Sequence, residues 1–345
     1  MNELKIRARI ESSPIMEHEA FAAQWYSDRA DDFVKIRQSS IRFGETQDVT
    51  EKEFWKSARA DGRVRTFPGF ATMLSNQEKE PWNEERDGVL RLVDYVDRRR
   101  NDFSHEGCAS FAGLSAAHIL GLPTLASHSE KVDRQVPPPR SSFTGVFSRT
   151  RRAIVEPVTI KVAGLPVSSI PQTVVDLARW EGPMDGLIAG DFMLHEGLGT
   201  TAQVADIVGR LPRVAGIHNA RLVLALMDSR VESPGESLTR WRFYEAGIAG
   251  LEPQVRVQTP SGGFRMDLFD ASRGVDIEFD GVEKIANPLM RGGKSFGEAM
   301  ADEARRQREL RHVGIQVYRL EWKDVITKES FERWLMRMRR YGLPY

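Results

Sequence analysis

The sequence predicts a protein that mixes helices and strands, of the α/β class and α+β overall. Two observations in its last third support this prediction. Apolar and polar side chains alternate over residues 264–269 and 275–280, with the period of two that half-buried strands show, and IQVYRL at 315–320 is expected to be a further strand. Apolar residues recur at helical spacing before, between and after these strands. Residues 234–341 therefore predict the order αβββαβα, with a crossover helix leading to the last strand of a mixed sheet.

Length and composition indicate how this fold is divided. The chain has 345 residues, more than one hydrophobic core usually spans, so two or three domains are expected. We place an N-terminal region at residues 1–100, a middle domain at 101–228 and a C-terminal domain at 232–345. The polar segment DSRVESPGESL, which starts at Asp228, forms the boundary before the C-terminal domain.

Charge and cysteine content limit the possible partners and compartment. The 49 Lys and Arg residues balance 49 Asp and Glu residues, so a nucleic-acid surface has to come from a local patch. Cys108 is the only cysteine, which excludes an intrachain disulfide and a zinc site of several thiolates. The sequence contains neither a signal-peptide core nor an apolar stretch of membrane-spanning length. We therefore expect a cytoplasmic protein without a membrane partner.

The N-terminal region is polar and contains scattered aromatic residues. Its pattern predicts a helix over residues 18–27, a pair of strands within FVKIRQSSIRF at 33–43, and a helix over 88–100. A helix followed by a β-hairpin is part of a winged helix, but the second helix that would bind DNA is not evident. The sequence leaves open a degenerate winged helix in residues 1–100.

The middle domain combines a helix rich in small residues with strands and further helices. The first helix is expected in CASFAGLSAAHILGLP, where Gly121 and Pro123 end it. The alternating segment TIKVAGLPVSSI at 159–170 predicts strands. Two helical patterns follow, PQTVVDLARWEG and MDGLIAGDFMLHEG, and Pro171 falls in the first turn of the former, where proline is tolerated.

Three residues of the same region could also be ligands of a metal ion. His105, Cys108 and His118 are potential zinc ligands, yet no fourth ligand follows at a familiar spacing. A cysteine within an alanine-rich helix is more often part of the core. The core role is therefore favoured, and the metal cluster is kept as the alternative.

The segment VDIEFDGVEK at 275–284 raises the main question about function. As a strand it places Asp276, Glu278 and Asp280 on one face and apolar side chains on the other. Carboxylates this close repel one another and raise one another's pKa unless a cation lies among them. Either water solvates this face, or a metal ion or a lysine neutralises it.

A second carboxylate is expected beside Glu278. The preceding strand, FRMDLFD at 264–270, is joined by a short turn, so Asp267 and Glu278 come together on a shared polar face. Two such carboxylates suit Mg²⁺ (or Mn²⁺), which binds oxygen ligands, activates water and stabilises charge on a phosphate. Lys284 could hold that water or neutralise the acids. The alternative without chemistry is a solvated face on which Arg265 pairs with one of the carboxylates.

Glu236 has two interpretations. Ser233, Pro234 and Glu236 fit an S-x-x-E capping box with proline at the first helical position, and capping alone explains Glu236. A helix that starts beside the strand ends would also present Glu236 to the carboxylates. We therefore count Glu236 as a candidate catalytic residue.

Basic residues gather downstream of these acids. Residues 285–345 contain 13 Lys and Arg against 8 Asp and Glu. The last helix is expected at 328–341, with Arg333 and Arg337 on a face of their own. Such a face suits a phosphate backbone, although solvated arginines are the commoner meaning. The stripe expected to be buried on another side of this helix is formed by Phe331, Trp334, Leu335, Met338 and Tyr341.

Several of these motifs, in this order and spacing, resemble a known family. The segments are ESPGESL, RMDLFD, VDIEFDGVEK, EARRQRELRHVG and VYRLEWKDV. Together they are similar to the very-short-patch-repair-like nuclease domain of the PD-(D/E)XK superfamily, which forms the C-terminal half of many actinobacterial proteins. Upstream, FSHEGCASFAGLSAAHILGLP and GLPVSSIPQTVVDLARWEGPMDGLIAGDFMLHEG resemble the middle region of antitoxins of the abortive-infection type IV toxin–antitoxin class. The resemblance covers roughly residues 102–325.

The resemblance implies a restriction-endonuclease-like αβββαβ core, preceded by antitoxin-like domains of mixed helices and strands. Asp267 would be the acid of the PD motif and Glu278 the acid of the (D/E)XK motif. Asp280 stands where that motif has its lysine, so this chain departs from the family pattern. Lys284, four residues further on, would replace the missing charge.

The function implied is a Mg²⁺-dependent DNA endonuclease, or a nuclease-like member of a phage-defence or toxin–antitoxin system. Asp267 and Glu278 would bind the metal, and Glu236 would add a further carboxylate. DNA phosphates would be held by Arg306, Arg333 and Arg337. The alternatives are a non-catalytic DNA-binding antitoxin or transcriptional regulator that retains the nuclease fold and binds a cognate toxin, and a protein whose domains mediate protein contacts alone.

Overall fold

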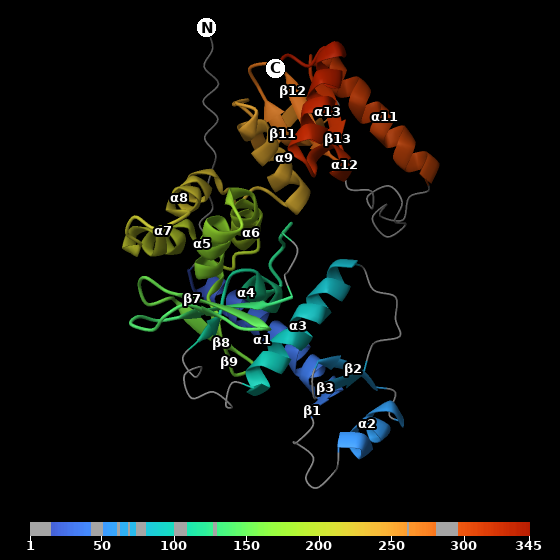
Figure 1. The fold of residues 1–345 in the computed structure, drawn as a ribbon. Helices are drawn as coiled ribbons and strands as arrows, with labels where there is room; N and C mark the ends of the chain where they lie inside the picture. Colours follow the sequence, from blue (N-terminus) through green and yellow to red (C-terminus); the bar gives the residue numbers. More distant parts are fainter. Residues whose placement is uncertain are drawn as a thin grey trace.

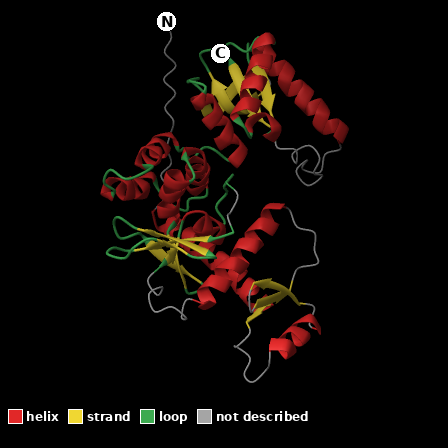
Figure 2. Cartoon of the chain, viewed as in Figure 1, coloured by secondary structure: helices red, strands yellow, loops and turns green. Residues whose placement is uncertain are grey.

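The structure, a computed structural model, describes residues 15–42, 51–60, 63–67, 70–73, 81–99, 109–126, 130–260, 262–280 and 296–345. Over these residues the chain combines helices with sheets of three, six and four strands, so the predicted α+β class is confirmed (Figures 1 and 2). No helix within these ranges is long and apolar enough to span a membrane.

The N-terminal region combines helices with a small sheet. Its elements are α1 (Ile15–Ser39), β1 (Ser40–Arg42), α2 (Glu51–Ala60), β2 (Arg63–Phe67), β3 (Phe70–Met73) and α3 (Pro81–Arg99). The strands are antiparallel in the order β1-β3-β2. Helices α1 and α3 lie against each other, and Arg37 of α1 bonds to Asp94 at 2.8 Å and to Asp97 at 2.5 Å on α3. The helix expected over 88–100 is confirmed as the C-terminal part of α3.

Of the strand pair predicted within residues 33–43, the second strand is confirmed in part as β1, but the first is wrong because helix α1 runs through that segment. Tyr26, Ala30 and Phe33 recur at helical spacing. They pack in the hydrophobic core that α1 and α3 share with the middle domain, where Phe33 is fully buried. That spacing outweighs the short alternation that suggested strands. The last residue of the predicted pair, Phe43, lies outside the described residues, and β2 and β3 form the hairpin of this region instead.

The middle domain combines a six-stranded sheet with helices, of which α5 to α8 gather on one side of the sheet (Figure 1). The strands are β4 (Ser110–Phe111), β5 (Val132–Val136), β6 (Phe143–Thr144), β7 (Ser148–Arg152), β8 (Thr159–Val162) and β9 (Leu165–Ser168). The helices are α4 (Gly113–Leu120), α5 (Ile170–Trp180), α6 (Pro183–His195), α7 (Thr201–Arg210) and α8 (Ile217–Leu226). The strand order is β6-β7-β5-β4-β9-β8. The strands expected in 159–170 and the two helices after them are confirmed.

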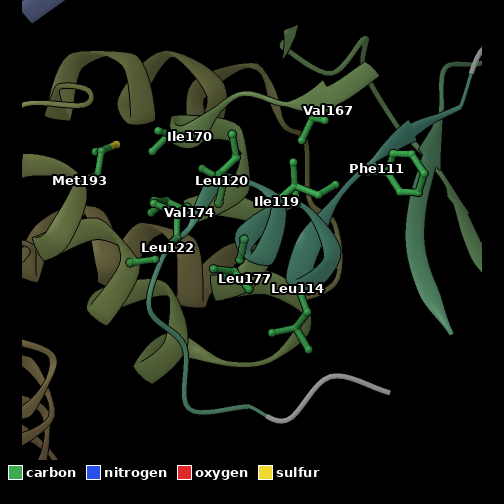
Figure 3. Close-up of a cluster of buried hydrophobic side chains, with 14 of the residues drawn as sticks. Phe111, Leu114, Ile119, Leu120, Leu122, Val167, Ile170, Val174, Leu177 and Met193 are labelled. Carbon is green, nitrogen blue, oxygen red and sulfur yellow. The ribbon is translucent and has the colours of Figure 1, made fainter. Parts of the chain in front are cut away.

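Local signals explain where these helices start and stop. Gly121 ends α4 in the left-handed conformation, with φ 69°, and Pro171 falls in the first turn of α5, both as expected. Ser169 caps α5 by accepting the N–H of Gln172. Apolar side chains of α4, β9, α5 and α6 then meet in one core, as Figure 3 shows. They include Ile119, Leu120, Val167, Ile170, Val174, Leu177 and Met193.

The C-terminal domain has the predicted αβββαβ order. Its elements are α9 (Pro234–Glu245), β10 (Glu252–Thr259), β11 (Gly262–Asp270), β12 (Val275–Phe279), α11 (Phe296–His312), β13 (Gln316–Leu320), α12 (Trp322–Val325) and α13 (Lys328–Arg340). The strand order is β10-β11-β12-β13. The first three strands are antiparallel, and β13 is parallel to β12, so α11 belongs to the predicted crossover between them.

The two faces of this sheet differ in chemistry. Leu268 and Ile277 lie on an apolar face, where they share a core with Trp334 of α13 and with apolar side chains of α9. The opposite face carries Asp276 and Glu278, whose side chains alternate with those of their apolar neighbours. Helix α11 contributes charged side chains to this second face. The carboxylates are therefore enclosed between the sheet and a helix rather than open to water.

The apolar stripe predicted on the last helix is confirmed except at its end. Its buried members are Phe331, Trp334 and Leu335, and Met338 is half-buried. Tyr341, by contrast, is 74% exposed. The helix ends before this residue and the chain turns at Gly342, which has φ 97°. Leu343 is buried in the same core in its place.

The middle and C-terminal domains touch through a buried carboxylate of α6. Asp191 accepts the backbone N–H of Asp228 at 2.7 Å and a guanidinium N–H of Arg240, from α9, at 3.0 Å. Burial raises the pKa of Asp191 to about 6, although Arg240 opposes this. Trp241 of α9 also joins the core of the middle domain. Helix α9 thus belongs to one domain by sequence and packs against both.

Candidate functional site

The register of the C-terminal sheet brings the two predicted metal ligands together. Leu268 on β11 is paired with Ile277 on β12 in an antiparallel ladder. One step further in the same register, Asp267 lies opposite Glu278, and residues directly opposite in such a ladder point to the same face. The backbone N–H of Phe279 also donates to Oδ2 of Asp267 at 3.3 Å. Asp267 and Glu278 are therefore cross-strand neighbours, as the sequence predicts.

The same level of the sheet carries polar residues on the outer strands. On β13, Arg319 is paired directly with Glu278. On β10, Gln254 lies between residues whose register places it opposite Asp267. A polar row of Gln254, Asp267, Glu278 and Arg319 thus crosses the sheet from edge to edge. Buried polar groups in such a row need partners, so ion pairing or chemistry is expected at this level of the sheet.

Two arginines hold the side chain of Glu278, which is 10% exposed. Arg319 donates from Nε to Oε2 of Glu278 at 3.0 Å. Arg306, on α11, is ion-paired through Nη2 with the other carboxylate oxygen, Oε1. Both oxygens of Glu278 therefore accept charge-assisted hydrogen bonds, which are among the stronger ones in proteins.

Further carboxylates surround these arginines. Glu303 of α11 is ion-paired with Nη2 of Arg319 and lies 3.5 Å from Nη1 of Arg306. Asp280 lies 3.5 Å from Nε of Arg319. With Asp276, which lies 3.6 Å from Arg306, the described residues form what we call the carboxylate–arginine cluster. Its members are Asp267, Asp276, Glu278, Asp280, Glu303, Arg306 and Arg319, so carboxylates outnumber guanidinium groups.

Asp276 is the most deeply buried acid of the cluster. It is fully buried, and among the described residues neither of its carboxylate oxygens has a hydrogen-bond partner. Burial, together with the charge of neighbouring Glu278, raises the pKa of Asp276 to about 8, and Arg306 only partly offsets this. Burial therefore favours the protonated form of Asp276.

Glu278 behaves in the opposite way. Burial alone would raise its pKa, but hydrogen bonds and charge from Arg306 and Arg319 outweigh burial and lower the pKa of Glu278 below its usual value. Two acids two residues apart thus have pKa values shifted in opposite directions. Glu278, whose ionised form is favoured, is the acid that could bind a cation.

The donor set of the cluster suits a hard divalent cation, but its present geometry does not offer an open site. Carboxylate oxygens are the ligands that Mg²⁺ prefers. Within the described ranges, however, no group of three or more His, Cys, Asp or Glu side chains is arranged to hold a metal ion. Both oxygens of Glu278 are taken by arginines. A metal ion could bind Asp267 and Glu278 only after these arginine contacts are exchanged.

Glu236 serves as a helix cap, with one additional contact to the sheet. Its side chain accepts from the hydroxyl of Ser233 at 2.8 Å and from the backbone N–H of Glu232 at 3.2 Å. Ser233 in turn accepts the N–H of Glu236. Gln254, of the polar row, donates to Glu236 at 2.9 Å. The capping interpretation accounts for most of these bonds, and Gln254 links Glu236 to the row that carries Asp267.

The predicted phosphate-binding arginines are not brought together. Arg306 lies inside the cluster, whereas Arg333 and Arg337 are exposed on α13. Because α13 packs on the apolar face of the sheet, it lies on the side opposite to Glu278. Arg337 lies 3.5 Å from Asp324. The predicted catalytic Lys284 lies outside the described residues.

Two members of the cluster were missed by sequence reasoning. The sequence offered Arg265 as the neutralising residue, but Arg265 bonds Glu232 at 2.6 and 2.7 Å instead. Arg319 and Glu303 take part in the cluster in its place. The polar position of Arg319 in the strand pattern was a usable signal, but its pairing with Glu278 depends on the register of a parallel strand after a long crossover.

An open groove of about 520 Å³ lies beside the cluster, along the outer strand β13. Its polar lining includes Gln307, Arg311, Gln316, Arg319 and Tyr341. Arg319 therefore faces both Glu278 and the groove. A phosphate in this groove could reach an arginine that also holds the predicted metal ligand.

The alternative metal cluster in the middle domain is not supported. His118 is buried in helix α4, where its neighbours are apolar core residues. His105 and Cys108 lie outside the described residues. The core role that the sequence favours for Cys108 therefore stays a prediction.

Comparisons with known proteins add little to this geometry. No protein-family model and no curated protein matches the chain. Among solved structures, a similar chain is described as the crystal structure of the RV2827C protein from Mycobacterium tuberculosis. It is 14% identical, with a TM-score of 0.34, and the match covers 70% of this chain and 89% of that one. A similarity this distant carries no argument about function.

Proposed function

We propose that the C-terminal domain is a metal-dependent DNA endonuclease of the PD-(D/E)XK type, in which Asp267 and Glu278 bind Mg²⁺ or Mn²⁺. The observation that supports this is the antiparallel register of β11 and β12, which makes these two acids cross-strand neighbours. The αβββαβ order is the one that the sequence resemblance implies for such nucleases. The acid excess of the carboxylate–arginine cluster also favours a cation there.

A divalent cation bound by these two acids would activate a water molecule and stabilise negative charge on the phosphate being cleaved. The chain's own groups would have different tasks. Asp276, whose protonated form is favoured by burial, would add no further charge to the site while it holds its proton. Glu236 would fix Gln254 beside the polar row rather than contact the substrate. Lys284 would supply the cation that the motif lacks at Asp280.

Access to Glu278 depends on its two arginines. Arg319 lines the groove along β13 together with Arg311, so a DNA phosphate in the groove would compete with Glu278 for its guanidinium group. Substrate binding would then release one oxygen of Glu278 for the metal. Arg306, deeper in the cluster, would either stay bonded to the carboxylates or also leave Glu278. DNA and metal would in this way bind cooperatively.

The same proposal implies a biological role for the protein. The sequence resemblance favours a role in phage defence or in a toxin–antitoxin system, with DNA and a cognate toxin as partners and a cytoplasmic location. The middle domain would then carry the antitoxin-like role.

The test is cleavage of plasmid DNA by the purified full-length chain with Mg²⁺ or Mn²⁺. Asp267→Asn keeps the shape of a half-buried side chain and should abolish cleavage. Glu232→Gln, which alters an acid bonded to Arg265 outside the cluster, is the matched control and should cleave like the parent. Absence of cleavage by the parent chain with either metal, or equal cleavage by Asp267→Asn, would reject the endonuclease.

A second function is favoured by one specific observation. Both oxygens of Glu278 are neutralised by Arg306 and Arg319, and an aspartate occupies the position of the motif's lysine. This arrangement suits a non-catalytic DNA-binding regulator or antitoxin that keeps the nuclease fold. Such a protein would bind DNA with a steep dependence on salt and leave it intact. Binding without cleavage in the same plasmid experiment would identify it.

A further inference from the structure

The middle domain contains a second cavity, of about 330 Å³, far in sequence from the cluster. It opens between the ends of β5 and β7, helix α5, and the segment that joins α7 to α8. Its lining combines apolar residues with arginines and glutamines. Pockets of this size and mixed lining are typical of small-molecule sites.

The polar lining of the cavity is cationic. Arg151 donates to Asp133 at 2.5 Å, and its guanidinium lies 4.1 Å from the ring centre of Trp180. Arg179 donates to a backbone carbonyl at 3.3 Å. Arg152 is exposed at the rim, and no carboxylate of the described residues is ion-paired with it. With Arg149, which also binds Asp133, four arginines lie near the three carboxylates Asp133, Asp176 and Glu181, so the pocket favours an anion.

The charge of Arg179 is also poorly neutralised. Among the described residues Arg179 is ion-paired with Asp176, at 3.7 Å. Asp176 is fully buried, and burial raises its pKa to about 7 against the opposing effect of Arg179. Around neutral pH Asp176 is therefore protonated for part of the time. Arg179 then has charge to offer to a ligand.

Gln135 gives an independent sign of a ligand. Its side chain, 4% exposed, lines the cavity, and Oε1 has no hydrogen-bond partner in the described structure. A buried amide oxygen without a partner is costly, so such groups are commonly found where a ligand completes them. The neighbouring Gln172, by contrast, is satisfied by Asp176 and by the backbone of Val158. Gln135 therefore has an acceptor oxygen available for a donor group on the edge of a ligand.

The cavity also has apolar lining residues. They include Val155, Pro157, Leu211 and Val214. An inorganic anion alone would leave these residues and Gln135 unused. An apolar acid without a polar edge would leave Gln135 unsatisfied. The ligand that uses all three features has an anionic group, a flat body and an edge with a hydrogen-bond donor.

We propose that this cavity binds a nucleoside monophosphate, with its phosphate on Arg152 and Arg179, its base against the apolar lining residues, and the edge of the base bonded to Gln135. Glutamine amides match the donor–acceptor edges of nucleobases, and arginines bind phosphate with paired N–H groups. The proposal rests on the middle domain alone. It is independent of whether the C-terminal domain cleaves DNA.

The test is isothermal titration calorimetry of the full-length chain with AMP, GMP, CMP and UMP, beside the matching nucleosides and inorganic phosphate. At least one monophosphate should bind at least tenfold more tightly than its nucleoside and than phosphate. Arg152→Ala should weaken that binding at least tenfold. Arg210→Ala, an exposed arginine of α7 paired with Asp206, is the charge-matched control and should bind like the parent.

Gln135→Met removes the polar edge but keeps the length of the side chain. It should reduce the preference among the four bases, while Arg152→Ala lowers the affinity for all of them. The proposal would be overturned if none of the four monophosphates gave a heat of binding. It would also be overturned if Arg152→Ala and Arg210→Ala lost the same affinity. The proposal would also be overturned if a short single-stranded oligonucleotide bound through the same residues at least tenfold more tightly than the monophosphates. The cavity would then be a site for single-stranded nucleic acid.

Discussion

The middle and C-terminal domains each bury a carboxylate between two arginines, but the charge left over has opposite signs. In the middle domain, Asp133 accepts from Arg149 at 2.7 Å and from Arg151 at 2.5 Å. Additional arginines, Arg152 and Arg179, line the adjoining cavity. The excess charge around this cavity of the middle domain is positive.

In the C-terminal domain the surplus is negative. Glu278 accepts from Arg306 and Arg319, yet Asp276, Glu303 and further carboxylates crowd the same two arginines. A paired carboxylate is therefore not informative by itself, since both domains contain one. We propose that the charge left over by each pair selects the ligand, an anion in the middle domain and a cation in the C-terminal domain.

The largest effect that could break this comparison is on stability. Arg306→Ala leaves Glu278 and Asp276 buried with one arginine, and we expect a loss of about 3 kcal/mol in the free energy of unfolding. Arg149→Ala should cost only about 1 kcal/mol, because its side chain is 39% exposed and Arg151 stays on Asp133. Urea unfolding of both variants measures the difference. Equal losses would mean that the two clusters are energetically alike.

The second prediction concerns pH and the surplus charge of the middle domain. Unfolded Asp176 ionises near pH 4, whereas the folded protein holds its proton until about pH 7. Between these values the folded state binds more protons, so stability falls as the pH rises and levels off above pH 7. Relative to Asp176→Asn, the parent should lose about 2 kcal/mol between pH 5 and pH 7. Urea unfolding of both proteins at each pH checks this, and parallel curves would contradict it.

How far the sequence predicts these two sites depends on how local their contacts are. Asp267 and Glu278 sit on strands joined by a short turn, so alternation and turn length were enough to pair them. Arg319 reaches Glu278 across a parallel ladder that follows a crossover helix. The register of such a ladder is not specified by local pattern, and the arginines that close the site were therefore not foreseen.

The same reason explains the rest of the molecule. The helices and strands of the C-terminal domain were predicted because each has a clear period and a polar turn. The first part of the segment at 33–43 was misjudged, since its short alternation concealed the longer helical spacing that includes Phe33. The middle-domain cavity is lined by residues from separate elements, among them Gln135, Arg179 and Val214. No sequence motif predicts such a cavity.

A third prediction tests the negative surplus directly. Arg319→Ala frees one oxygen of Glu278, so this variant should bind Mn²⁺ more tightly than the parent. At Mn²⁺ ten times above its dissociation constant, the gain in stability is about 1.4 kcal/mol. Thermal unfolding with and without Mn²⁺ measures it. Asp267→Asn in the Arg319→Ala background should remove the gain, and a gain that survives would place the ion elsewhere.

The smallest expected effect separates the structural and catalytic roles of Glu236. Ser233→Ala removes an N-cap and one bond to Glu236, so it should cost about 1 kcal/mol, as should Thr200→Ala at the N-cap of α7. Urea midpoints compare the two caps. Glu236→Gln retains an oxygen for the cap and should change stability little.

If Glu236→Gln also cleaves DNA like the parent, then Glu236 only supports the row through Gln254. If it folds normally but cleaves poorly, its charge contributes to the C-terminal site. In that case the negative surplus extends from the cluster to the start of α9, because a neutral amide of the same shape changes only the charge. The difference between the excess charges of the two domains would then be larger still.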